Sequence, residues 1–151
     1  MRRRALAAGI AVLAAGAVLT AAGAPAPAAA QEAPTAAPKG AIVYFHNLRN
    51  GQRLPKTFWV RIGLKEMGVA PAGVRVMGTG HHHILVDADM PPAGQPIPSD
   101  FNHVHLGGGQ TEAQLTLTPG RHTLQLLVGD HAHIPHVPPI KSERITVTVS
   151  E

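Results

Sequence analysis

Apolar side chains recur at every second position through much of this chain, and this period constrains the fold more than any other feature. The clearest case is the segment 57–64, where four apolar side chains fall on one side of an extended strand: Phe58, Val60, Ile62 and Leu64. Successive side chains of a strand point to opposite faces, so the pattern predicts a half-buried strand. No segment shows a helical period with caps at both ends. The chain is therefore expected to be all-β.

Short runs of the same kind continue along the chain, separated by turn residues such as Asn50-Gly51 and Pro119-Gly120. Further strands are expected at residues 41–45, 74–77, 82–87, 103–106, 113–117, 122–128 and 145–149. This spacing predicts an antiparallel immunoglobulin-like β-sandwich of about seven strands, with a small β-barrel as the alternative. The strands on either side of Pro119-Gly120 are expected to pair as a hairpin that buries six aliphatic side chains.

The first 30 residues have the three parts of a secretory signal peptide. Residues 2–4 are arginines, an Ala/Gly/Val/Leu-rich run follows, and an Ala-Ala-Ala sequence ends at Ala30. We therefore expect a signal peptide over residues 1–30, a disordered Pro/Ala-rich leader over 31–38 and one β-sandwich domain over 39–151. A retained membrane anchor is the alternative, but a run made mostly of Ala and Gly gains little from burial in lipid.

Export would place the mature domain in the periplasm or outside the cell, without membrane association after cleavage. The chain has 13 Lys and Arg residues against 9 Asp and Glu, and removal of the three N-terminal arginines leaves 10 against 9. A nearly neutral domain without a basic patch is a poor candidate for binding nucleic acid. The chain contains no Cys, which excludes both disulfides and a lipid-modified cysteine.

Histidines are concentrated in the second half of the chain. Ten occur in the sequence, and nine of them fall in the range 81–136, in three groups and one isolated position. Residues i and i+2 of a strand point to the same side, so a His-x-His pair projects two imidazoles together. Two such pairs on neighbouring strands would surround one ion, and neutral imidazole is a common ligand of Cu and Zn. The predicted metal ligands are His81, His83, His103 and His105, with His133 and His136 contributed by a loop.

Other polar residues near these groups have structural interpretations. His82 points away from its two neighbours and is expected in the core, and His122 is expected to bond a nearby backbone carbonyl. Four carboxylates are available as a further ligand or as acceptors that fix a histidine tautomer: Asp87, Asp100, Glu112 and Asp130. No nucleophile motif, P-loop or HExxH sequence occurs, so no catalytic residue is predicted.

Several ordered motifs resemble a known bacterial family. They are Gly78-Thr79-Gly80-His81-His82-His83, His103-Val104-His105, Gly109-Gln110-Thr111-Glu112 and Pro119-Gly120-Arg121-His122-Thr123-Leu124. From about Lys39 to Ser150 the chain is similar to the exported family catalogued as domain of unknown function 4399, although Leu106 stands where an aromatic is expected. The resemblance implies a small, exported, β-rich domain with no established activity.

The leading functional hypothesis is an exported module that binds a transition metal, Cu or Zn, for storage, sensing or delivery. A second hypothesis is a structural or interaction module of the cell envelope that binds a protein or glycan, with its histidines in a hydrogen-bond network. A third is a copper-dependent redox enzyme, which would need an open coordination position beside a pocket.

Overall fold

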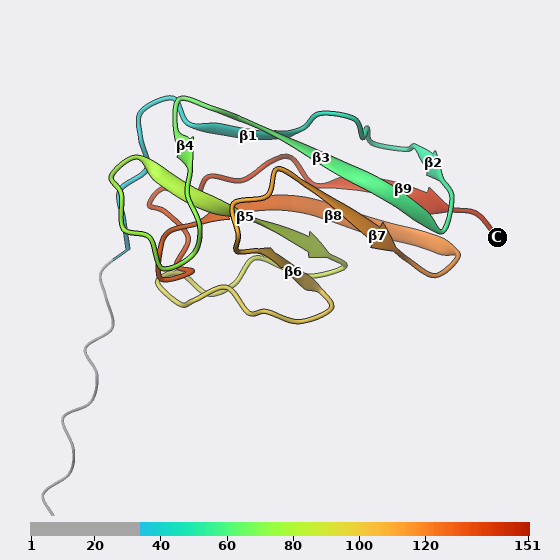
Figure 1. Ribbon diagram of the computed structural model, residues 1–151. Helices are drawn as coiled ribbons and strands as arrows, with labels where there is room; N and C mark the ends of the chain where they lie inside the picture. Colours follow the sequence, from blue (N-terminus) through green and yellow to red (C-terminus); the bar gives the residue numbers. More distant parts are fainter. Residues whose placement is uncertain (1–33) are drawn as a thin grey trace, which may run out of the picture. The chain divides into compact units, whose positions relative to one another are not determined.

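The computed structural model describes residues 34–151, so the predicted signal peptide and the first three residues of the predicted leader lie outside the described part. The described residues contain nine strands, which form two sheets that pack face to face (Figure 1). The expected all-β sandwich is confirmed, and the sheets do not close into a barrel. Within residues 34–151, no helix has the length and hydropathy needed to cross a membrane.

The smaller sheet has three antiparallel strands in the order β1 (Ile42–Phe45), β3 (Thr57–Lys65) and β7 (Glu112–Thr116). Alternation along β3 sends Phe58, Val60 and Ile62 into the interior, while the residues between them remain exposed. The period that predicted this strand therefore also identified its buried face.

The larger sheet has the order β2 (Arg53–Leu54), β9 (Ile145–Val149), β8 (Gly120–Gly129), β5 (Thr79–Val86) and β4 (Gly68–Val69). Strand β6 (His103–Leu106) also pairs with β5, on the edge opposite β8. Two short pairings, β2 with β9 and β4 with β5, are parallel, whereas the expectation was a purely antiparallel arrangement.

The main core lies between the two sheets. Strand β8 contributes Leu124, Leu126 and Val128, and β5 contributes Ile84 and Val86, all at most 1% exposed. Each such side chain stabilises the fold by about 1.5–3 kcal/mol on burial. A second, smaller apolar cluster of Leu85, Ile97 and Leu127 lies on the outer face of the larger sheet.

The expected hairpin around Pro119-Gly120 is wrong. Strand β7 pairs with β3 in the smaller sheet, and β8 pairs with β5 and β9 in the larger one, so the turn carries the chain across the sandwich (Figure 1). The expected burial is nevertheless present, since Leu115 and Leu117 face the same core as the β8 residues. A turn motif signals a reversal of direction, and two amphipathic strands can bury their apolar faces across a layer as well as side by side.

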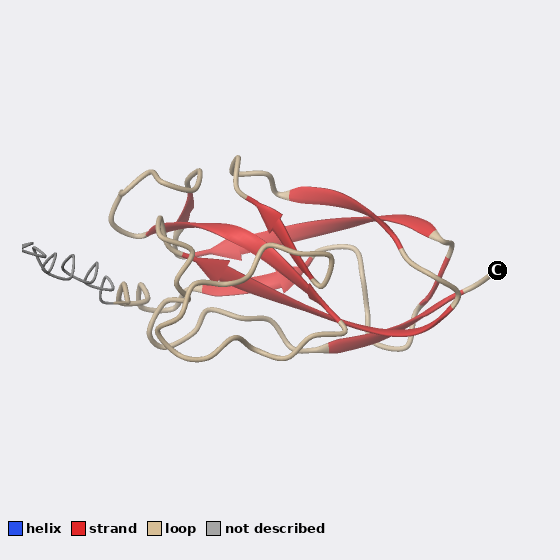
Figure 2. Cartoon of the chain, turned by 90° about the horizontal axis from the view of Figure 1, so that it is seen from below, coloured by secondary structure: helices blue, strands red, loops and turns tan. Residues whose placement is uncertain are grey.

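Two further expectations differ from the structure. Residues 74–77 form no strand, and the side chains of Val74, Val76 and Met77 are exposed. Figure 2 shows the described part of the chain as strands joined by loops and turns. Residues 34–38, expected to belong to a disordered leader, are hydrogen-bonded to the domain. The N–H of Ala37 donates to the carbonyl of Val137 over 2.9 Å, and the N–H of Val137 donates to the carbonyl of Thr35 over 2.9 Å.

Candidate metal centre

Strand β5 divides the first histidine group between its two faces. His82 shares the inner face with the core residues Ile84 and Val86, whereas His81 and His83 share the outer face with Leu85. Both outer histidines are fully buried, at 0% exposure. Loops therefore cover this part of the outer face, and β5 is shielded from water on both sides.

The third imidazole comes from β6. The antiparallel register places His105 directly opposite His83, and their ring centroids are 5.0 Å apart. The His105 ring is also 5.0 Å from the ring of His81. Gly107 leaves room for this ring, because a Cβ at that position would collide with it.

The fourth imidazole comes from the loop that follows β8. The ring of His133 lies 5.0 Å from that of His81, 4.8 Å from that of His105 and 6.1 Å from that of His83. The ring centroids of His81 and His83 are 4.8 Å apart, so the centroids of all pairs among these four rings lie within 6.1 Å of each other. We call this group, His81, His83, His105 and His133, the four-histidine cluster.

Asp130 shapes the loop that carries His133. Its carboxylate is buried and accepts the backbone N–H groups of Ala132 and Ile134, over 2.9 and 3.0 Å. The N–H of His133 donates to the carbonyl of Asp130, and the N–H of Ile97 donates to the carbonyl of His133. His133 itself has a φ of 65°, a left-handed conformation that is uncommon outside glycine and that these bonds hold in place.

Nitrogen spacing in the cluster is close to what one ion requires. The Nε2 atoms of His81 and His83 are 3.0 Å apart, and two nitrogens bound to one tetrahedral ion are about 3.3 Å apart. One nitrogen from each of His81, His105 and His133 lies within 4.8 Å of the others. Binding of one ion by all three would require the rings to move closer together.

Several buried nitrogens in the cluster have no hydrogen-bond partner among the described residues. They are Nδ1 of His81, Nδ1 of His83 and Nε2 of His105. A buried polar atom left without a partner costs about 1–3 kcal/mol, and such atoms are uncommon in folded proteins. The cluster therefore holds nitrogen atoms that the domain itself does not satisfy.

Three rings of the cluster, those of His81, His83 and His105, have lowered pKa values that favour the neutral form at neutral pH. Burial, together with the neighbouring imidazoles of His81, His105 and His133, lowers the pKa of His83 to about 2. Burial, with the rings of His133 and His105, lowers the pKa of His81 to about 4, although the carboxylate of Asp130 opposes this. The pKa of His105 is lowered by burial and by the neighbouring ring of His133. Neutral rings keep a lone pair free for a metal ion.

Two of the six predicted ligands lie outside the cluster. His103 is opposite Leu85 in the register and its Nδ1 is 2.9 Å from a carboxylate oxygen of Asp100. His136 is buried, and its Nδ1 is 3.5 Å from the carbonyl oxygen of Val128. The structure thus brings together His81, His83, His105 and His133.

The residues with predicted structural roles lie apart from the cluster or support it. His122 has its Nε2 2.8 Å from the carbonyl oxygen of Thr118 and its Nδ1 2.6 Å from a carboxylate oxygen of Asp87. Glu112 pairs with Arg61 on the exposed face of the smaller sheet. His82 is buried in the core with neither ring nitrogen bonded among the described residues, and burial lowers its pKa to about 4.

Sequence reasoning missed the residues that make space for the cluster. Besides Gly107, a Cβ at Gly129 would lie 3.2 Å from Nε2 of His83 and 3.1 Å from Cδ1 of Ile97. Gly129 lies opposite His81 in the pairing of β5 with β8. The glycines at 107 and 129 are visible in the sequence, but their closeness to histidine rings follows only from the sheet register.

Comparison with known proteins identifies a family and no individual relative. Residues 60–150 match the model of the family described as Domain of unknown function (DUF4399). No curated protein matches the chain. No solved structure matches it either.

Proposed function

The chain belongs to the family of domains of unknown function DUF4399, and we propose that it binds one Cu or Zn ion through the four-histidine cluster. The observation that carries this proposal is the convergence of four imidazoles from β5, β6 and the loop after β8, with ring centroids 4.8–6.1 Å apart. Segments far apart in the sequence thus meet at one point. A packing role alone does not require four ionisable rings to meet there.

His81, His105 and His133 are the first three ligands in this proposal, because one nitrogen from each lies within 4.8 Å of the others. His83 is the fourth, since its Nε2 is 3.0 Å from that of His81. Three or four neutral nitrogens without a thiolate suit Zn and Cu, whereas Mg and Ca prefer oxygen ligands. The depth of His81 and His83 would exclude water from one side of the ion.

The proposed setting is the periplasm or the outside of the cell. The arginine block, apolar run and Ala-Ala-Ala sequence within residues 1–30 support export. An exported metal-binding domain of this size is suited to storage, sensing or delivery of the ion. We propose no catalytic residue.

A purely structural role for the cluster is the competing hypothesis. Histidines elsewhere in the domain do make complete local hydrogen bonds, as His122 does with Asp87 and Thr118. Within the cluster, Nε2 of His81 and Nε2 of His83 are at hydrogen-bond distance from each other, as a structural network would require. The cluster differs from His122 because four imidazoles converge there and Nε2 of His105 is buried without a partner among residues 34–151. This convergence, rather than the unpartnered nitrogen alone, favours an ion as the common partner.

Strand β6 supplies a matched pair of variants for the test. His105 and His103 project from the same face of the same strand, but only His105 belongs to the cluster. Calorimetric titration with Zn²⁺ and Cu²⁺ should give saturable binding in the wild type, a loss of affinity of more than about 100-fold in His105→Ala, and little change in His103→Ala.

Two results would contradict the proposal. One is the absence of saturable binding tighter than about 10 µM, which corresponds to about −7 kcal/mol. The other is an equal loss of affinity in the two alanine variants. Thermal unfolding with and without a chelator gives an independent readout, because a bound ion stabilises the folded state.

A further inference from the structure

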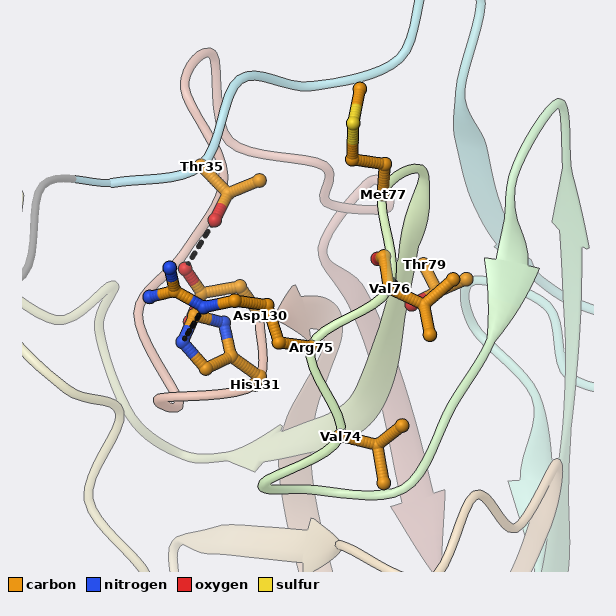
Figure 3. Close-up of a pocket in the computed structure, with 8 residues that line it drawn as sticks. All are labelled: Thr35, Val74, Arg75, Val76, Met77, Thr79, Asp130 and His131. Carbon is orange, nitrogen blue, oxygen red and sulfur yellow. Dashed lines mark hydrogen bonds between the residues drawn. The ribbon is translucent and has the colours of Figure 1, made fainter.

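The segment 34–38 lies against the loop that carries His133. Ala36 forms a parallel bridge with Val137, flanked by the two backbone hydrogen bonds described above. Next to this bridge, the hydroxyl of Thr35 donates to Oδ2 of Asp130 over 2.7 Å, and Figure 3 shows this bond within a pocket that both residues line. The N-terminal segment is therefore joined to the histidine loop by both backbone and side chain.

The two carboxylate oxygens of Asp130 have separate tasks. Oδ1 accepts the backbone N–H groups of Ala132 and Ile134, which lie on either side of His133. Oδ2 accepts the hydroxyl of Thr35. Because the carboxylate is planar and rigid, the bond at Oδ2 sets the orientation in which Oδ1 meets the loop.

From this chain of contacts we propose that Thr35 is a positioning residue of the metal centre. Its hydroxyl orients the Asp130 carboxylate, and the carboxylate holds the backbone on both sides of His133 so that the imidazole faces His81 and His105. This inference rests on the proposed metal-binding function. It adds that the N-terminal segment of the domain, far from the histidines in sequence, sets the affinity of the site.

The backbone of His133 explains why such support is needed. A φ of 65° is disfavoured for a residue with a Cβ, so the loop would relax toward other conformations without its hydrogen bonds. Relaxation would move the ring of His133 away from rings that lie 4.8 and 5.0 Å from it. His81, His83 and His105 project from paired strands and do not depend on this loop.

The Asp130 carboxylate is itself stabilised as the anion. Burial alone would raise its pKa, but the bonds from Thr35, Ile134 and Ala132 outweigh burial and the pKa is lowered. The anion is the form that accepts all three bonds. Loss of the hydroxyl would leave a buried oxygen of a charged group without its side-chain donor.

The test uses protein purified from cells that express the full-length chain, with Zn²⁺ and Cu²⁺ as probes. Thr35→Val removes the hydroxyl and keeps the side-chain shape, and we expect it to weaken metal affinity about tenfold, the lower end of the range for residues that support a ligand. Thr35→Ser keeps the hydroxyl and should restore wild-type affinity. Thr57→Val is the matched control, because it removes a hydroxyl that bonds Thr116 in the smaller sheet.

A double-mutant cycle with His133→Ala separates positioning from general stability. If Thr35 acts through His133, Thr35→Val should cause no further loss of affinity in the His133→Ala background. The Cu²⁺ electron paramagnetic resonance spectrum should also report one nitrogen ligand fewer in a fraction of the Thr35→Val protein. Melting temperatures of all variants identify any that are not folded.

The outcomes distinguish this inference from the proposed function. If the wild-type protein binds neither Zn²⁺ nor Cu²⁺, both the proposed metal-binding function and the role of Thr35 are contradicted. Wild-type protein that binds, with Thr35→Val binding equally well, would overturn the role of Thr35 and leave the metal centre intact. Additive losses in Thr35→Val and His133→Ala, or the absence of rescue by Thr35→Ser, would also overturn it.

Discussion

Strands β3 and β5 have nearly equal lengths, nine and eight residues, but only β3 has one face exposed to solvent along most of its length. Thr57, Trp59, Arg61 and Lys65 of β3 are exposed, Trp59 at 44%, whereas β5 is buried from Gly80 to Val86. The smaller sheet covers the inner face of β5, and loops cover the outer face. In such a strand, a polar side chain on either face is buried and therefore costs folding free energy.

The polar residues of β5 are therefore informative. Outward-facing residues of β3 include Arg61, which water solvates, while the corresponding positions of β5 hold His81 and His83 without access to water. Further along the same face, Leu85 packs into an ordinary apolar cluster. Because the outer face of β5 accommodates a leucine, packing on this face does not require histidine. Burial of the two polar rings costs folding free energy, and this cost points to a function.

The largest predicted effect is a loss of stability on acidification, caused by the buried histidines of β5, which have no counterpart in β3. The pKa values of His81 and His82 are about 4 and that of His83 is about 2 in the folded domain, against 6.5 when exposed. Above pH 6.5 these rings are neutral in both states; below it the unfolded chain takes up protons that the folded domain resists. Urea unfolding of the metal-free protein should show a loss of at least about 3 kcal/mol between pH 7 and pH 5.

A bound ion competes with protons for the same rings, so Zn²⁺ should move the acid transition to lower pH. Stability that stays constant between pH 7 and pH 5 would mean that the histidines of β5 are accessible to water. The pair of His122 and Asp87 is no source of this loss. Burial would lower the pKa of His122, but its ring nitrogens donate to the Asp87 carboxylate and the Thr118 carbonyl, and these bonds raise the pKa. The contribution of this pair to stability is therefore retained below pH 6.5 and declines only at higher pH.

The inner and outer faces of β5 should respond differently to the same substitution. His82→Leu replaces a ring with two unpartnered nitrogens in an apolar core, and we expect stabilisation by about 2 kcal/mol at pH 7 with unchanged metal affinity. His83→Leu should also stabilise the metal-free domain but weaken metal binding. Chemical denaturation and calorimetry on the two variants measure this contrast, and loss of metal affinity in His82→Leu would refute the division of faces.

A glycine beside the cluster should affect metal affinity through the space it leaves for a histidine ring, and not through the flexibility of its backbone. Gly107→Ala places a Cβ against the ring of His105, so we expect metal affinity to fall about tenfold as that ligand is displaced. Gly108→Ala is the matched control, because its Cβ would meet only the flexible end of the Gln110 side chain. Equal affinities of the two variants would show that His105 need not hold its observed position.

The smallest effect is expected on the exposed face of β3. Arg61 and Glu112 form an ion pair over 3.1 Å, with side chains 54% and 49% exposed. Solvent screening limits such a pair to about 0–1 kcal/mol, so Arg61→Ala should change the free energy of unfolding by less than about 0.5 kcal/mol. A larger loss, measured by urea unfolding, would mean that the outer face of β3 is less solvated than it is in the structure.

The period of two predicted much of the fold but only part of the candidate site. It correctly placed His81 and His83 on one face and His82 on the other, because side-chain direction follows from local backbone geometry. The same reasoning placed His103 with His105, and those two do share a face. Register separates them: His105 is opposite His83, whereas His103 is opposite Leu85, two residues further along the strand.

Loop residues were harder to assign. His133 and His136 come from the same loop, but His133 joins the cluster and His136 does not. The backbone hydrogen bonds that the Asp130 carboxylate accepts and the left-handed backbone at residue 133 decide this, and neither can be read from the periodicity of the sequence. The contact between Thr35 and Asp130 spans 95 residues of sequence, so it was equally inaccessible to pattern reasoning.

What the amino-acid sequence determined by itself is the longer strands, the face on which their side chains lie and the supply of imidazoles, since all three depend on neighbours along the chain. The tertiary structure alone decided which strands pair, which imidazoles meet and how far water is kept from them. Those properties depend on register and on loop conformation, which are set by contacts between residues distant in sequence.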